Sequence, residues 1–210
     1  MSVYATVARL WPGSTVVCIG GGPSLTPADV EICRGQARVV AINDAYRLAP
    51  WADVLYACDA LWWTWHAGVP DFTGLKYSLT LPTNNRWGVQ ILRNDGPQGL
   101  ATKPDSLRTG SNGGYQAINL AVHLGAARIL LLGYDMARTG GQTHWFGEHP
   151  KRSAPPPFAK MLQAFPTLVA PLAARGVEVI NCTPTTALRT FPRRALRECL
   201  EINAFAEAAC

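Results

Sequence analysis

A short apolar run that breaks into three glycines, VVCIGGGPSL at residues 16–25, limits what this chain can fold into. Such a run is typical of a strand buried on both faces, and a glycine turn that then opens a helix is typical of the first connection in a parallel α/β sheet. Glycines have no Cβ, so their N–H groups can approach a phosphate closely, and the helix start adds unpaired donors. Pro23 has a φ preset for a first helical turn. The alternative to an anion site is a tight strand-to-helix turn that binds no ligand. The residues expected to contact the anion are Gly20, Gly21, Gly22 and Ser24.

The spacing of these glycines argues against two common nucleotide motifs. The turn has no lysine of the Walker type, and a G-x-G-x-x-G fingerprint starting at Gly20 would need glycine at Leu25. ATP hydrolysis and NAD-dependent redox chemistry are therefore disfavoured.

Length and composition are typical of one domain, which we expect to span residues 1–210. No apolar run reaches the roughly 20 residues of a membrane span, and no secretory signal is recognisable, so the expected location is cytoplasmic. Six scattered cysteines without CxxC pairs favour reduced core thiols over a disulfide framework or zinc site. The net charge of +5 is compatible with an anionic ligand or nucleic acid, and the oligomeric state stays open.

Strand-like and helix-like segments alternate along the chain. A helix is predicted to begin at Pro27 with Thr26 as its cap, and further helices are predicted over 112–124 and 157–175. This alternation predicts a single Rossmann-like doubly wound, mostly parallel sheet with helices on both faces. Two long connections, 81–110 and 135–157, interrupt it, and we expect the second to be a histidine-containing active-site loop. The predicted strands are 14–19, 37–42, 53–58, 128–133 and 177–181.

Polar residues follow several of these strands. Ligands of doubly wound sheets bind outside the carboxyl ends of the strands, so Asn43, Asp59, and the pair Tyr134 and Asp135 become candidates. Asn43 and Asp59 have an alternative role as turn or helix-cap residues. Trp62 is either a core residue or a stacking platform for a base or sugar.

A second glycine turn, LRTGSNGGY at residues 107–115, precedes the helix predicted over 112–124. Thr109, Ser111 and Asn112 can donate to an anion beside the helix N-terminus. The alternative is an ordinary helix that Ser111 or Asn112 caps. We expect ligand contact here.

The segment THWFGEHP at residues 143–150 carries the best catalytic candidates. His144 and His149 are five residues apart, which does not fit the i, i+4 zinc pair of a helix, so no metal is expected there. Either imidazole can take a proton from an acceptor hydroxyl. Lys151 and Arg152 can neutralise phosphate charge.

Together these motifs resemble the bacterial sialyltransferases that use CMP-sialic acid and modify lipooligosaccharide, and the broader superfamily that includes the archaeal-type hydroxymethylpterin pyrophosphokinase. The chain is also similar to uncharacterised phage-associated proteins with a GGGPSL opening and a His-Trp-x-Gly-x-His loop. Besides the histidine loop, the shared features are GGGPSL at 20–25, Asn43, the turn at 111–113, GYD at 133–135 and CTP at 182–184.

The resemblance implies that the two glycine turns hold a nucleotide and that a histidine of the late loop is the general base, with His149 preferred over His144. Tyr134 or Trp145 would take the place of the tyrosines that steady the leaving phosphate in the sialyltransferases. Asp59 is closer to the pyrophosphokinase branch, in which an acidic residue here helps to place a metal-bound triphosphate.

The leading hypothesis is a glycosyltransferase-like enzyme that needs no cofactor and transfers a sugar from a nucleotide donor to an acceptor hydroxyl on a glycan or a phage DNA base. The second is a Mg²⁺-dependent pyrophosphokinase or nucleotidyl transferase, with Asp59 and Asp135 on the metal. The third is a non-catalytic nucleotide-binding protein.

Overall fold

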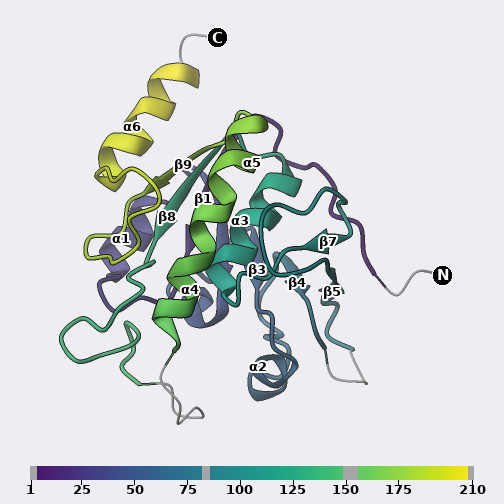
Figure 1. Ribbon diagram of the computed structural model, residues 1–210. Helices are drawn as coiled ribbons and strands as arrows, with labels where there is room; N and C mark the ends of the chain where they lie inside the picture. Colours follow the sequence, from purple (N-terminus) through teal and green to yellow (C-terminus); the bar gives the residue numbers. More distant parts are fainter. Residues whose placement is uncertain (1–3, 82–85, 149–155, 208–210) are drawn as a thin grey trace.

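The computed structural model describes residues 4–81, 86–148 and 156–207. Within these ranges, seven strands form one parallel sheet in the spatial order β5-β4-β3-β2-β1-β8-β9. The chain moves from β1 to one edge and then returns to the other side of β1 (Figure 1). The strands are β1 (Thr15–Ile19), β2 (Arg38–Ile42), β3 (Val54–Tyr56), β4 (Leu75–Ser78), β5 (Gln90–Ile91), β8 (Arg128–Leu132) and β9 (Glu178–Asn181).

The central strands are buried on both faces, which explains their unbroken apolar sequences. The register pairs Val17 with Val39 of β2 and with Leu130 of β8, so apolar side chains of the three strands lie side by side. All five predicted strands are present. The prediction missed β4, with the mixed sequence LKYS, and β5, a two-residue strand inside the predicted long connection at 81–110.

Helices cover both faces of the sheet, which confirms the predicted doubly wound architecture (Figure 1). On one face the core is completed by α3 (Gly113–Leu124), α4 (Phe158–Ala164), the 3₁₀ helix η2 (Phe165–Leu168) and α5 (Val169–Ala174). The other face packs against α1 (Pro27–Ile32), the 3₁₀ helix η1 (Asn43–Arg47), α2 (Ala60–Trp65) and α6 (Leu196–Glu207).

Helix boundaries follow the capping signals of the sequence. Thr26 caps α1 by accepting the Asp29 N–H, and Gly125 ends α3 at a φ of 107°. The single helix predicted over 157–175 is wrong, because η2 interrupts it at Pro166, which has no N–H for the helical ladder. Helix α6 was not predicted.

Five cysteines of the described chain are free thiols, as expected. Four are buried, and Cys58 is half-buried. Burial raises the pKa of Cys18 and of Cys33 to about 12, so both stay protonated at neutral pH. None of the helices in the described ranges has the length and apolar character needed to cross a membrane.

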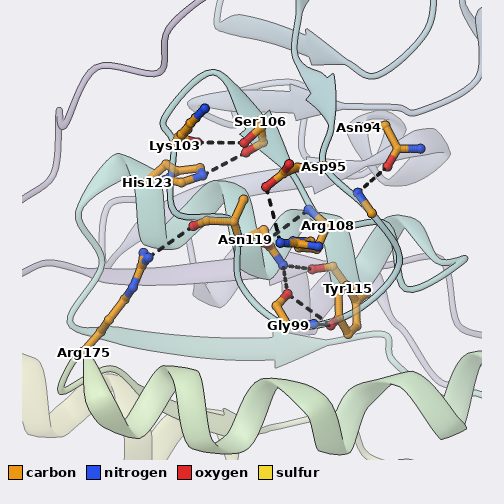
Figure 2. Close-up of polar contacts among 12 residues, drawn as sticks. Asn94, Asp95, Gly99, Lys103, Ser106, Arg108, Tyr115, Asn119, His123 and Arg175 are labelled. Atoms are coloured by element: carbon orange, nitrogen blue, oxygen red, sulfur yellow. Dashed lines mark hydrogen bonds and ion pairs between the residues drawn. The ribbon is translucent and has the colours of Figure 1, made fainter.

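Polar side chains of α3 hold the segment that contains β6 (Arg93–Asn94) and β7 (Ser106–Leu107) (Figure 2). Asn119 Oδ1 accepts the Ala101 N–H at 2.9 Å, and Asn119 Nδ2 donates to the Gly99 carbonyl oxygen at 3.4 Å. His123 Nε2 donates to the Ser106 carbonyl oxygen at 2.9 Å, and burial lowers the pKa of this imidazole. These bonds replace the regular pairing that a long irregular segment lacks.

Asn119→Ala is therefore expected to destabilise the fold by about 2 kcal/mol, because the buried Ala101 N–H loses its partner and the Gly99 carbonyl oxygen keeps only the hydrogen bond from the Tyr115 hydroxyl. Urea unfolding followed by circular dichroism measures the change. Gln163→Ala, an exposed position on α4, is the control. Equal midpoints for the two variants would contradict this role of Asn119.

Candidate functional site

A cleft of about 780 Å³ lies at the carboxyl ends of the central strands. The order of the sheet reverses between β1 and β8, and this switch point is where open α/β sheets bind ligands. Segments that follow β1, β2, β3 and β8 line the cleft, together with the start of α3, the start of α4 and the loop around His144.

Most of the predicted site residues line this cleft. Three do not: Ser24, Thr109 and Trp145. His149, Lys151 and Arg152 lie outside the described residues. The predicted residues that line it are Gly20, Gly21, Gly22, Asn43, Asp59, Trp62, Ser111, Asn112, Tyr134, Asp135 and His144.

Two glycines of the first turn pack against the turn after β8. A Cβ on Gly22 would lie 2.0 Å from Asp135 Oδ1, and a Cβ on Gly20 would lie 2.6 Å from the Gly133 carbonyl oxygen. The Gly22 N–H donates to the same Gly133 oxygen at 2.8 Å. Packing between the two turns therefore requires glycine at positions 20 and 22.

Gly21 differs from its two neighbours. An added Cβ there would meet only His144 Cδ2, at 3.4 Å. The Gly21 carbonyl oxygen accepts the Trp145 N–H at 3.1 Å, and no hydrogen bond within the described part of the chain uses the Gly21 N–H. Of the three glycine N–H groups, this is the one left to a ligand.

Buried Asp135 and half-buried Ser24 form one hydrogen-bonded unit. The Ser24 N–H and hydroxyl donate to the two Asp135 carboxylate oxygens, both at 2.9 Å, and Thr139 donates at 3.2 Å. Burial raises the pKa of Asp135, and these hydrogen bonds oppose the rise. The Ser24 hydroxyl thus binds a carboxylate of the protein. The prediction that the glycine turn opens a helix is wrong, because α1 begins only at Pro27.

The second glycine turn lies directly at the N-terminus of α3. Asn112 is the cap, and its Oδ1 accepts the Tyr115 N–H at 3.0 Å. The capping alternative is therefore realised at Asn112. The Gly113 and Gly114 N–H groups come before the first hydrogen bonds of the helix, and both residues line the cleft. Thr109 instead uses its carbonyl oxygen to accept from Gln116 Nε2 at 2.9 Å.

Three cleft residues have a backbone conformation that non-glycine residues rarely adopt. Asn43 has a φ of 50°, Ser111 of 55° and Met136 of 51°. Such conformations concentrate at binding sites, where the surrounding structure imposes them. Asn43 is the first residue of η1 and follows the N-cap residue Ile42, and its Nδ2 lies 3.8 Å from the position of a Cβ on Gly113. The exposed Asn43 amide therefore lies beside the start of α3.

Trp62 belongs to the core. It is 2% exposed, its Nε1 donates to Asp44 Oδ2 at 3.0 Å, and its ring stacks on His66 at 4.3 Å. Only the small part of the Trp62 ring that reaches the cleft is left for the predicted stacking on a base or sugar. Asp59 occupies the N-cap position of α2 but makes no side-chain cap hydrogen bond.

Tyr134 is also buried, with 1% exposure. Its hydroxyl donates to the Gly114 carbonyl oxygen at 3.1 Å, and burial raises the pKa of the phenol well above its ordinary value. The Tyr134 hydroxyl thus binds the backbone of the second glycine turn. Trp145 packs its ring toward the core with Arg47 5.8 Å above it.

The loop around His144 is a tight hairpin. His144 and Gly147 exchange backbone hydrogen bonds of 3.1 and 2.9 Å, and the Trp145 N–H holds the hairpin on the first glycine turn. His144 lines the cleft and stacks on Phe146, with ring centroids 5.0 Å apart. Its Nδ1 lies 2.9 Å from Thr143 Oγ1.

The described lining is acidic. It contains Asp44, Asp59, Asp135 and Glu148, and no lysine or arginine comes from the ranges that the structure covers. Those ranges also hold no group of three or more histidine, cysteine or carboxylate side chains placed to bind a metal. In this part of the cleft, no backbone hydrogen bond of the described residues uses the N–H groups of Gly21, Gly113 and Gly114.

Sequence reasoning missed several lining residues. Gln116 Oε1 accepts the hydrogen bond of the buried Tyr56 hydroxyl at 2.9 Å, and its polar side chain in a mostly apolar helix was the available signal. Met136 and Met161 approach Asn112 Nδ2 with their sulfur atoms, and no local pattern marks them. Thr143 and Glu148 belong to the histidine segment, whose local pattern predicts no role for them.

Comparisons with known proteins agree with the fold. No family model and no curated protein matches the chain. The structure is similar to that of the MAf glycosyltransferase from Magnetospirillum magneticum AMB-1, with a TM-score of 0.66 and 15% sequence identity. The similarity covers 98% of this chain and 38% of the other chain, so this chain spans less than half the length of that protein. The fold of this chain is thus similar to that of part of a glycosyltransferase.

Proposed function

We propose that this chain binds a nucleotide-activated sugar in the cleft and transfers the glycosyl group to an acceptor hydroxyl. The observation that carries the proposal is the convergence of the Gly21 N–H and the start of α3 on one cleft at the switch point of the sheet. The glycosyltransferase-like fold supports the same reaction class.

The proposed chemistry needs a base and a stabilised leaving group. His144 lines the cleft, so its imidazole is our candidate to take the proton of the acceptor hydroxyl as that oxygen attacks the sugar. The N–H groups of Gly21, Gly113 and Gly114 would donate to the departing phosphate. Lys151 and Arg152 would add positive charge, and His149 is the competing candidate for the base.

Polar side chains of the cleft could also contact the base or ribose of the donor. The exposed Asn43 amide, which lies beside the start of α3, offers hydrogen bonds to a base or ribose, while the sugar and the base of the donor stay open. An acceptor on a glycan or on a phage DNA base is compatible with the positive net charge.

A Mg²⁺-dependent pyrophosphoryl or nucleotidyl transfer is the second candidate, and the acidic lining favours it. Mg²⁺ is commonly held by one or two carboxylates together with substrate phosphates. Asp59 and Asp135 both line the cleft and are the candidate carboxylates, and the oxygens of Asp135 accept from Ser24 and Thr139. The metal would neutralise phosphate charge that the described lining leaves uncompensated.

A thermal-shift screen against nucleotides and nucleotide sugars tests the proposal. A ligand that binds only the folded state and is present at 100 times its Kd stabilises it by about 2.7 kcal/mol. We expect CMP or another nucleotide to raise the Tm, and mass spectrometry to find slow hydrolysis of the matching nucleotide sugar without added metal.

Three other outcomes separate the hypotheses. Turnover that chelators abolish would favour the Mg²⁺-dependent reaction. Tight binding with the nucleotide returned intact would favour a non-catalytic binding protein. No shift with any nucleotide or nucleotide sugar would contradict all three.

A further inference from the structure

The hairpin at His144 also fixes the side chains on either side of it. Because His144 pairs with Gly147, the flanking residues Thr143 and Glu148 face each other across the two strands of the hairpin. Thr143 Oγ1 donates to Glu148 Oε2 at 3.1 Å and lies 2.9 Å from His144 Nδ1. Thr143 is 4% exposed, so this hydroxyl bridges the two groups away from bulk water.

Arg138 completes the arrangement. Its guanidinium donates to Glu148 Oε1 at 3.0 Å and to the Gly141 carbonyl oxygen at 2.8 Å. The two ion-paired side chains are half exposed, so their attraction adds little to stability. What the pair provides is a fixed, ionised carboxylate on one side of the Thr143 hydroxyl.

The direction of each hydrogen bond follows from the number of protons. An ionised carboxylate only accepts, and a threonine hydroxyl has one proton to donate. If Thr143 donates that proton to Glu148, its oxygen must accept from His144, so the imidazole proton lies on Nδ1. In a neutral imidazole the other nitrogen, Nε2, then carries the lone pair.

We propose that Thr143 and Glu148, with Arg138 behind them, are positioning residues that hold neutral His144 as its Nδ1–H tautomer, so that Nε2 is the proton acceptor. The reaction that uses this nitrogen rests on the proposed function. In that reaction Nε2 takes the acceptor hydroxyl proton, the acceptor oxygen bonds to the anomeric carbon, and the phosphate leaves with the electron pair of the broken C–O bond.

The tautomer can be read without any substrate. Long-range ¹H–¹⁵N correlation spectra of the ¹⁵N-labelled protein distinguish protonated from unprotonated ring nitrogens, and the His144 signals are those lost in His144→Gln. At a pH where the ring shifts no longer change, we expect Nδ1 to be protonated and Nε2 not. A predominant Nε2–H form would overturn the proposal, whether or not the protein is a glycosyltransferase.

Three variants test the role of the bridge. Thr143→Val removes the hydroxyl at nearly constant volume, and we expect the tautomer equilibrium to move toward Nε2–H. Thr143→Ser keeps the hydroxyl and should restore the native tautomer. Thr102→Val, an exposed threonine outside the cleft, is the matched control and should leave it unchanged. A native tautomer in Thr143→Val would overturn the proposal.

Turnover supplies an independent readout once a donor is known. We expect Thr143→Val to lower kcat at least tenfold with KM for the donor nearly unchanged, and Thr143→Ser to recover most of it. The proposed function fails if no nucleotide sugar is turned over. The positioning role fails if Thr143→Val changes neither the tautomer of His144 nor kcat, or only one of them. The two failures are therefore distinguishable.

Discussion

Replacing His144 with alanine is expected to lower kcat for glycosyl transfer by a factor of about 10² to 10⁴, the usual contribution of a general base. The His144 imidazole lines the cleft, its Nδ1 lies 2.9 Å from the Thr143 hydroxyl, and its ring lies against Gly21 at the proposed phosphate site. Nucleotide affinity should change little, because the proposed phosphate contacts come from backbone N–H groups. Steady-state kinetics and a nucleotide titration measure the two quantities separately.

His149→Ala is the companion variant, because the resemblance to sialyltransferases ranks His149 first. If His144 is the base, His149→Ala should retain most of kcat. A large loss in His149→Ala with near-normal turnover in His144→Ala would move the base to His149 and contradict our assignment. An equal, small effect of both variants would leave the proposed mechanism without a base.

Local signals predicted the frame of the fold well. The buried runs that became β1, β2 and β8 have no alternation, and Thr26 followed by Pro27 marks the start of α1 as the structure has it. These features depend on residues close in sequence, where propensity and capping act directly. The same reasoning could not find β5, since a strand of two residues has no period to read.

The packing of the first glycine turn could not be predicted from local sequence for a different reason. The partner that explains Gly22 is Asp135, more than a hundred residues away along the chain, and the same carboxylate occupies Ser24. A glycine that accommodates a distant side chain looks the same in sequence as a glycine that accommodates a phosphate. The prediction placed Gly20 and Gly22 at the cleft, but it could not reveal that both pack against the turn after β8.

Local sequence patterns identified the candidate base but not the contacts that orient it. A histidine in a polar, glycine-containing segment was recognisable, whereas the bridge from His144 through Thr143 to Glu148 depends on the hairpin register. The register is set by the backbone pairing of His144 with Gly147. The spacing of catalytic residue types in a sequence does not reveal such a pairing.

Gly22→Ala is expected to destabilise the protein by about 3 kcal/mol, at the upper end of typical overpacking costs. The new methyl group would lie 2.0 Å from Asp135 Oδ1 and 2.7 Å from the Gly133 carbonyl oxygen, which is backbone of the turn after β8. To relieve the overlap, Asp135 must give up hydrogen bonds to Ser24, or the two turns must separate at the switch point. Urea unfolding measures the loss.

Gly21→Ala is the matched control one residue away. Its φ is not positive, and its Cβ would meet only His144 Cδ2 at an ordinary contact distance of 3.4 Å, so stability should change by less than about 1 kcal/mol. The double variant Gly22→Ala/Asp135→Ala should be less destabilised than the sum of the single changes, because removing the carboxylate removes the shortest overlap. Additive losses, or equal stability of the two glycine variants, would show that Gly22 is not required by Asp135 and would return this turn to the role of an anion site alone.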